Sequence, residues 1–432
     1  MAACNLARPQ RRRKAGLRPP LACGRPAHTS SIRFPPSLPL RPIQILFFSV
    51  SHFSEQLKSQ DDAHLTRLKT WFRWNNKNSY SIAALMPLIE AGIAREPKDG
   101  IMLYSFATAQ AEEVYAEVGL AEADAVYIAG GPHPSALPEE VLEHFDFVVI
   151  GEGEETLPEL LAAIEEGRDP AAVKGIAYKC RGKVSFTEKR SPVNLDCYPP
   201  FGKILAPIEI SRGCPWGCSY CQTPRLFGGQ MRHRSIESIS KYARRHKDIR
   251  FTSPNSLAYG SDGREIRLDK VAALLKALAE LEKPIYFGTF PSEVRPDFVS
   301  HSSLELIEKY CANDALSIGG QSGSPAVLRS INRGHGREEI EGACEIVLEH
   351  GLMPQVDLIF GLPGECAEDQ RITLDLAKWI VAGGGKVRAH RFMPLPGTPL
   401  AGARPAPLTA EVEACLGKLA LEGKLSGSWS SR

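Results

Sequence analysis

The sequence predicts an α/β fold in two parts: a doubly wound parallel sheet, followed by a partial (β/α)6 barrel. Two observations support this prediction. Short apolar runs of strand length alternate with helical patterns over most of the 432 residues. The alternation breaks near Pro199 and Pro200 and then resumes with six further strand–helix units, fewer than the eight of a closed barrel.

The first series contains four strands and four helices. We predict strands at 43–50, 101–106, 124–129 and 145–150, and helices at 80–92, 108–119, 137–144 and 155–166. Strands that alternate with helices of this length form a parallel sheet covered on both faces. Residues 171–205 then have the pattern of a short hairpin and a linker.

The second series begins at Pro207. Its predicted strands are 207–211, 249–253, 285–289, 315–319, 355–360 and 387–392, and its clearest helices are 268–281, 338–350 and 370–382. Apolar residues recur at helical spacing in the first of these helices, at Val271, Leu274, Leu275, Leu278 and Leu281. A Pro-rich segment, 394–407, leads into a short terminal helix.

These patterns divide the chain into five segments. They are a basic tail (1–42), a first sheet domain (43–170), a hairpin and linker (171–206), the barrel (207–402) and a C-terminal helix and tail (403–432). The tail has nine Lys and Arg residues and no acidic residue, and we expect it to be disordered because it holds too little apolar surface to fold. A transit peptide and a start site placed too far upstream are the alternatives.

Composition excludes some classes of protein. With 43% apolar and 24% charged residues, the chain has the composition of a soluble globular protein. Its net charge of +2 favours neither a nucleic acid nor a membrane surface as partner. Since no apolar run reaches the ~18 residues of a membrane span, we expect no membrane association.

Three of the eleven cysteines lie close together, which marks a metal centre. Cys214, Cys218 and Cys221 follow the first barrel strand with the spacing C-x3-C-x2-C. Thiolates in one tight loop can reach a common soft metal centre. Structural zinc sites and electron-transfer [4Fe–4S] clusters use four protein ligands, so three cysteines indicate a centre with an open position. The alternative is a zinc site completed by His233.

The cysteine segment resembles the signature of a known family. C-x3-C-x-aromatic-C after the first barrel strand, with Tyr220 as the aromatic residue, is similar to the motif of the radical S-adenosylmethionine superfamily. The segment 319–323 resembles its fourth-strand element, and 356–365 and 392–399 resemble its fifth and sixth. The likeness is to the subgroup with an N-terminal cobalamin-binding-type domain. It implies a Rossmann-like first domain and a TIM-type barrel.

The resemblance also implies roles for individual residues. Cys214, Cys218 and Cys221 would bind a [4Fe–4S] cluster, whose open iron would bind S-adenosylmethionine. Adenine would lie near Tyr220, Ile359 and Gly361, and the ribose or carboxylate near Gln321 and Ser322. Arg295 either pairs with the S-adenosylmethionine carboxylate or forms a surface ion pair with Glu293.

The sequence departs from the family pattern at the second strand. The Gly-Gly-Glu that often binds the methionine amino group is replaced by the segment 252–256. Asn255 or Ser256 could substitute for it, and the contact is left unassigned.

The first domain departs from its family pattern as well. Gly130 and Gly151 begin loops that resemble those of cobalamin-binding domains, but the D-x-H-x-x-G motif that supplies a histidine to cobalt is missing. Asp62 and His64 match it only partly, and His133 is better explained as a loop residue held between prolines. Whether cobalamin binds stays open at this point.

These observations predict an enzyme that reductively cleaves S-adenosylmethionine and acts on an unidentified substrate, small molecule or other. If cobalamin binds, methyl transfer is the expected outcome; otherwise hydrogen abstraction is expected. Such an enzyme needs an electron donor, for example ferredoxin or flavodoxin, and a reducing cytoplasm suits its cluster. A nucleic-acid partner is not expected, and a methylthiolating RNA-modifying enzyme is a variant. The alternative from another class is a non-catalytic zinc-binding or interaction protein.

Overall fold

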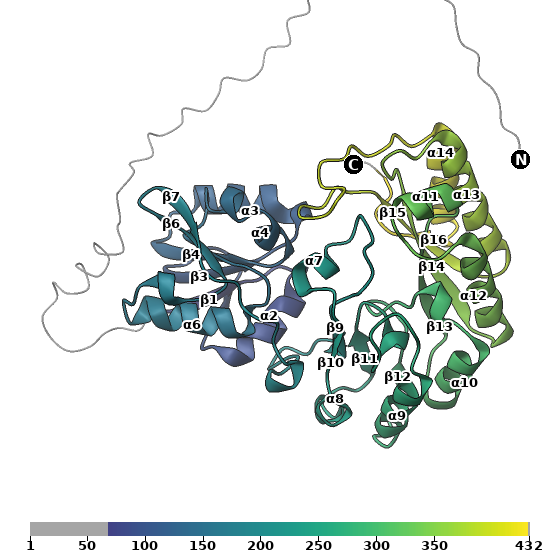
Figure 1. The fold of residues 1–432 in the computed structure, drawn as a ribbon, viewed down its shortest axis with the longest axis horizontal. Coiled ribbons are helices and arrows are strands. Elements are labelled where there is room, and N and C mark those ends of the chain that lie inside the picture. The colour runs from purple at the N-terminus through teal and green to yellow at the C-terminus, as the bar shows by residue number, and fades with distance from the viewer. Residues whose placement is uncertain (1–67, 431–432) are drawn as a thin grey trace, which may run out of the picture. The chain divides into compact units, whose positions relative to one another are not determined.

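A computed structural model describes residues 68–430, which form a seven-stranded, mainly parallel sheet and a second array of mainly parallel strands, with their covering helices (Figure 1). The predicted strand at 43–50 and the partial motif at Asp62 and His64 lie outside the described residues. The mixed α/β class predicted from the sequence is confirmed.

The first sheet has the strand order β2-β1-β3-β4-β5-β6-β7. Its strands are β1 (Thr70–Arg73), β2 (Gly92–Ala94), β3 (Gly100–Ser105), β4 (Ala125–Gly130), β5 (Phe147–Val149), β6 (Ile176–Cys180) and β7 (Lys183–Phe186). Strands β1 to β5 are parallel, whereas β6 and β7 form an antiparallel hairpin on β5. The hairpin at 171–205 therefore extends the first sheet.

Successive side chains of each strand point to opposite faces of this sheet. Both faces are therefore apolar, and helices cover both of them. On β3, Ile101 and Leu103 pack with Leu160 of α6, whereas Met102 and Tyr104 belong to a separate cluster on the opposite face. The helices are α2 (Ser79–Leu85), α3 (Ala111–Leu120), α4 (Pro132–Ala136), α5 (Pro138–Val141) and α6 (Gly153–Glu165). The first sheet therefore has an apolar core on each of its two faces.

Three details of the first series differ from the sequence prediction. The helix expected at 80–92 ends early: α2 passes into a short 3-10 helix, Met86–Leu88, and β2 follows. The helix expected at 137–144 is the shorter α5, which begins at Pro138, and α4 is a separate helix that precedes it. Strand β1 was not predicted, since four residues are too few to show alternation.

The second part is an open, curved array of parallel strands. One sheet has the order β12-β11-β8 and the next β13-β14-β15-β16, and a parallel bridge between Val294 and Ile318 links them. The strands are β8 (Ile208–Glu209), β11 (Ile249–Thr252), β12 (Ile285–Tyr286), β13 (Ala315–Gln321), β14 (Met353–Phe360), β15 (Lys386–Arg391) and β16 (Leu425–Ser426). All six predicted positions carry strands, and β16 is an addition.

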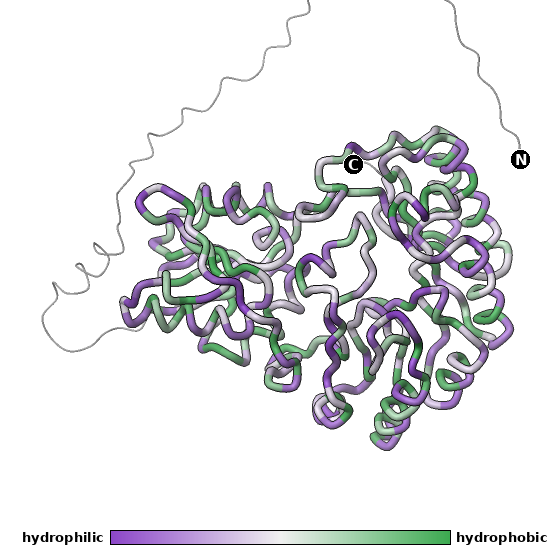
Figure 2. The backbone as a smooth tube through the Cα atoms, in the orientation of Figure 1, coloured by the Kyte–Doolittle hydropathy of each residue, from purple (hydrophilic) through white to green (hydrophobic). Residues whose placement is uncertain are grey.

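Helices lie along the outer side of these strands (Figure 1). They are α8 (Ile236–Ala243), α9 (Leu268–Ala279), α10 (His301–Tyr310), α11 (Pro325–Ser330), α12 (Arg337–Glu349), α13 (Ala367–Ala382) and α14 (Ala410–Leu421). Hydrophobic and hydrophilic stretches alternate along them (Figure 2), as expected for helices that bury one side. None of the helices between residues 68 and 430 has the length and apolar content that a membrane span requires.

Candidate functional site

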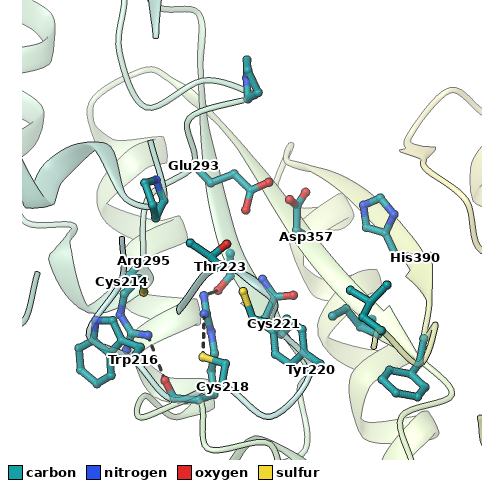
Figure 3. Close-up of a pocket in the computed structure, with 18 of the residues that line it drawn as sticks. Cys214, Trp216, Cys218, Tyr220, Cys221, Thr223, Glu293, Arg295, Asp357 and His390 are labelled. Atoms are coloured by element: carbon teal, nitrogen blue, oxygen red, sulfur yellow. Dashed lines mark hydrogen bonds between the residues drawn. The ribbon is translucent and has the colours of Figure 1, made fainter. Parts of the chain in front are cut away.

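The carboxyl ends of the barrel strands surround a cavity of about 460 Å³, which is where parallel barrels usually place their sites. The loop after β9 (Ser211–Arg212) forms one wall and carries the three cysteines (Figure 3). Other walls contain Ser253 after β11, Glu293 and Arg295 after β12, Gln321 at the end of β13, Asp357 and Ile359 on β14, and His390 on β15.

All three cysteines are free thiols that line this cavity. Their loop is fixed by backbone contacts: the Cys214 amide donates to the Gly228 carbonyl at 3.1 Å, and the Ser219 amide donates to the Ile331 carbonyl at 2.9 Å. Gly213 has a φ of +88°, and a Cβ there would lie 2.2 Å from the Gln230 carbonyl oxygen. Only glycine fits this turn, so the sequence Arg-Gly-Cys fixes how the loop leaves the strand.

The chemistry of these donors fits an iron–sulfur cluster better than a single zinc ion. Among residues 68–430, no three His, Cys, Asp or Glu side chains converge as one metal ion requires. Soft thiolates are the ligands that hold iron–sulfur clusters. His233 is also committed elsewhere: its ring nitrogens contact the Ser211 hydroxyl at 2.8 Å and the Ser261 carbonyl at 2.7 Å.

A cation that sequence reasoning missed lies beside the cysteines. Arg333 places Nη1 3.6 Å from the Cys218 sulfur, donates through Nη2 to the Gly319 carbonyl at 2.6 Å, and contacts His335 through Nε at 2.9 Å. Burial alone would lower the pKa of Arg333, but Tyr220 and Cys218 beside it raise that pKa above its ordinary value. The guanidinium is therefore a fixed positive charge at the cavity wall.

An acidic pair occupies the other side of the cavity, where Glu293 and Asp357 point toward one another (Figure 3). Burial, with Glu293 as the second cause, raises the pKa of Asp357 to about 9. Arg388 lies between them, with Nε 3.1 Å from Asp357 and Nη1 3.7 Å from Glu293. The pair can therefore hold a proton or accept hydrogen bonds from a ligand.

The structure brings most of the predicted residues together, but not all. Tyr220, Gln321, Ile359 and Arg295 line the cavity with the cysteines. Ser322 and Gly361 are not among its lining residues. The Ser322 hydroxyl is 2.9 Å from that of Thr373, and the Gly361 amide donates to Glu365 at 2.6 Å.

Arg295 does not pair with Glu293, and its pairing with the S-adenosylmethionine carboxylate stays a prediction. It is buried, stacks on Trp216 with its guanidinium carbon 3.6 Å from the ring centre, and donates to Asp297 and to the Arg333 carbonyl. Glu293 pairs with Arg388 instead, so the surface ion pair between Arg295 and Glu293 does not form.

At the second strand, the residues that reach the cavity are Ser253 and Pro254. Asn255 accepts from the Arg295 amide at 3.4 Å, and the Ser256 hydroxyl donates to the Ser292 carbonyl at 2.8 Å. Asn255 and Ser256 are thus engaged in contacts among the loops and are absent from the cavity lining.

A second cavity, of about 250 Å³, lies at the carboxyl edge of the first sheet. Its walls include Gly130, Gly131, Gly151 and Gly153 from the loops after β4 and β5, which allow a ligand to approach the backbone closely. No histidine lines it within the described part of the chain. His133 is buried in α4 and contacts Tyr115 at 2.9 Å and Thr108 at 3.2 Å, which fixes both ring nitrogens.

The buried Glu365 makes stability depend on pH. One carboxyl oxygen accepts from the Gly361 amide, and the other finds no hydrogen-bond partner among residues 68–430. Burial raises the pKa of Glu365 from 4.5 to about 7. The folded state keeps a proton that the unfolded state loses, so this contribution to stability is present below pH 4.5 and is lost as the pH rises through 7.

We therefore expect Glu365→Gln to lose less stability than the wild type between pH 5 and pH 8, by roughly 2–3 kcal/mol. Urea unfolding at the two pH values measures this difference. Glu368→Gln, at an exposed carboxylate three residues on, is the matched control and should follow the wild type. Equal pH dependence in the wild type and Glu365→Gln would show that Glu365 is ionised in the folded protein.

Fold and cavity together define a class: two-domain α/β proteins whose partial barrel presents three cysteines at its carboxyl end. Residues 208–377 match the family model of the radical SAM superfamily, and residues 82–161 match that of the B12 binding domain. The chain therefore contains a radical SAM domain and a B12-binding domain.

The chain is also similar in sequence to several named enzymes. The chain is 24% identical over 276 residues to bacteriochlorophyllide d C-12(1)-methyltransferase of Chlorobaculum tepidum, covering 63% of this chain and 59% of that protein. It is 27% identical over 322 residues to tRNA-2-methylthio-N(6)-dimethylallyladenosine synthase of Rickettsia akari, covering 67% and 66%. The chain spans between 57% and 64% of the length of relatives from Methanopyrus kandleri, Chlorobaculum tepidum and Pyrococcus horikoshii.

Among solved structures, the fold is similar to that of the radical S-adenosylmethionine methyltransferase TsrM from Kitasatospora setae. The TM-score is 0.59 at 18% identity, covering 78% of this chain and 77% of that one. The cobalamin-dependent S-adenosylmethionine radical enzyme OxsB gives a TM-score of 0.56, covering 73% and 52%. Both likenesses support the two-domain fold.

Proposed function

We propose that this protein reductively cleaves S-adenosylmethionine at a [4Fe–4S] cluster bound by Cys214, Cys218 and Cys221, and acts on a substrate not yet identified. The observation that carries the proposal is that three free thiols from one loop face a single cavity, with no fourth cysteine lining it in the described residues. When bound, the cluster would supply the electron that breaks a carbon–sulfur bond of S-adenosylmethionine.

Different residues of the cavity are proposed to bind different parts of S-adenosylmethionine. Arg333 is proposed to pair with the methionine carboxylate because its guanidinium lies beside Cys218, one of the cysteines proposed to bind the cluster. Tyr220 and Ile359 provide the apolar face for adenine, and Gln321 provides a polar group for the ribose. The buried walls exclude water, which protects a reactive intermediate from side reactions.

Cobalamin is the second proposed cofactor. The glycine loops of the second cavity suit a ligand that approaches the backbone, and similar proteins include cobalamin-dependent enzymes. Since no histidine lines that cavity in the described residues, the ligand would bind without one from there. Bound cobalamin favours methyl transfer over hydrogen abstraction. Corrin absorption that survives desalting of the reconstituted protein tests this assignment.

The proposed chemistry requires an electron donor and a reducing environment. An electron donor such as ferredoxin or flavodoxin must reduce the cluster, and a reducing cytoplasm would preserve it. The substrate is proposed to be a small molecule that binds beside S-adenosylmethionine at the carboxyl end of the barrel.

Metal content separates this proposal from a zinc-binding protein. Anaerobic purification and reconstitution are expected to give a brown protein with roughly four irons per chain. Metal and sulfide analysis measures this. A colourless protein with one zinc per chain, unchanged by iron and sulfide, would contradict the proposal.

A further inference from the structure

Arg212 stands at the centre of a buried charge network, two residues before Cys214. Its Nη2 donates to Glu154 at 2.6 Å, and Nε and Nη2 donate to Glu209 at 2.8 and 2.7 Å. Arg212 and Glu154 are 8% and 6% exposed. Burial alone would lower the pKa of Arg212, but Glu209 and Glu154 raise it well above its ordinary value. Arg212 and Glu154 therefore form a buried, hydrogen-bonded ion pair.

The loop 151–154 of the first sheet, which carries Glu154, also contacts the strand that pairs with β9. Glu152 accepts from Arg232 Nη1 at 3.1 Å and from the Val193 amide at 2.8 Å, and it lies 3.6 Å from Arg212 Nη1. Arg232 belongs to β10 (Arg232–His233), which pairs antiparallel with β9 and places Arg232 opposite Arg212. The loop 151–154 thus anchors both strands that carry the base of the cysteine loop.

The connection from Arg212 to Cys214 is stiff. Gly213 touches the Gln230 carbonyl so closely that no side chain fits, and the Cys214 amide is bound by the Gly228 carbonyl. A change in the position of Arg212 therefore displaces Cys214 rather than being absorbed between them.

The second cavity includes the same charged groups in its walls. Glu152, Glu154 and Arg212 line it, with Phe227, whose ring centre lies 5.3 Å from the Arg212 guanidinium carbon. A ligand in that cavity consequently contacts the side chains that anchor the cysteine loop.

We propose that Arg212 is a positioning residue through which the loop 151–154 fixes Cys214, so that occupation of the second cavity is transmitted to the metal centre. The inference rests on the proposed binding of a cluster by the three cysteines. The groups around a metal ligand orient it and tune the metal, and the ion pair of Arg212 with Glu154 performs this role from another sheet.

The test compares two neighbouring carboxylates in the reconstituted full-length protein. Glu154→Gln removes the carboxylate through which the first sheet binds Arg212 and leaves Glu209 in place, whereas Glu155→Gln changes the next residue, whose partners are Arg190 and Tyr198. Iron release to an excess of chelator is followed with and without hydroxocobalamin, and the reduced cluster is recorded by electron paramagnetic resonance. Circular dichroism verifies folding, and Arg212→Lys serves as a second variant if Glu154→Gln fails to fold.

We expect Glu154→Gln to release iron about tenfold faster than the wild type, a ratio that corresponds to ~1.4 kcal/mol. Its resonance spectrum should change, and hydroxocobalamin should slow iron release in the wild type and Glu155→Gln but not in Glu154→Gln. Wild-type rates and spectra in Glu154→Gln would overturn the proposal. So would a wild type that does not retain hydroxocobalamin, or that retains it with no effect on release. Failure of the proposed function is distinct, because the wild type would then assemble no four-iron cluster.

Discussion

Cys218→Ala is expected to abolish reductive cleavage of S-adenosylmethionine while leaving the fold largely intact. Cys218 is the most buried of the three cysteines and is the one that Arg333 contacts. Loss of groups that merely orient a metal ligand reduces affinity or activity by 10- to 100-fold, so loss of a ligand itself should exceed about 100-fold. The measurement is 5′-deoxyadenosine formed per chain, with iron content determined on the same sample.

The control for this substitution is Cys180→Ala, at an exposed thiol in the β6–β7 hairpin. Cys180→Ala removes a thiol that lies outside the cysteine loop. Its iron content and its yield of 5′-deoxyadenosine should therefore equal those of the wild type. Full cleavage by Cys218→Ala would show that Cys218 is not a ligand. If circular dichroism shows that Cys218→Ala is unfolded, the same measurement is made on Cys221→Ala, whose thiol is less buried.

Arg333→Gln is expected to weaken the use of S-adenosylmethionine by about 100-fold in kcat/KM, because truncating a buried charged partner typically costs 2–5 kcal/mol. The loss should fall mainly on KM, since the charge is proposed to bind the carboxylate. Arg333→Lys should recover part of it: a lysine keeps the charge but not the two parallel hydrogen bonds. Steady-state formation of 5′-deoxyadenosine at varied S-adenosylmethionine concentration measures both constants.

Arg329→Gln provides the matched control, four residues earlier and exposed on α11. It should behave as the wild type. Because Arg333 also contacts Cys218, iron content must be compared across all variants. If Arg333→Gln keeps both its iron and its wild-type KM, the carboxylate binds elsewhere and the role assigned to Arg333 is wrong.

Local patterns in the sequence predicted the fold and the centre of the site because both depend on short segments. Strands β3, β4, β13, β14 and β15 appear where apolar runs indicated them. The cysteine spacing follows the same logic, since Cys214, Cys218 and Cys221 lie in one loop and need no distant residue to be brought together.

The rest of the site depends on tertiary contacts that no local pattern records. Arg333 sits in a loop after α11 and becomes notable only because the barrel carries it to Cys218. Asp357 did leave a signal, as a charged residue inside an apolar strand, but its partner Glu293 lies on a distant loop. Ser322 fell outside the lining because it follows Gln321, and neighbours in sequence can face opposite sides of a strand end. Gly361 lies just beyond β14, where its φ of +78° turns the chain and its amide donates to Glu365.

We propose that this cavity binds a cluster with one open iron, at which S-adenosylmethionine is reduced. The most direct measurement is the product formed when the anaerobically reconstituted protein is mixed with dithionite and S-adenosylmethionine. We predict 5′-deoxyadenosine and methionine in equal amounts, and neither without the reductant. A protein that carries its full complement of iron and yet yields no 5′-deoxyadenosine would contradict the claim.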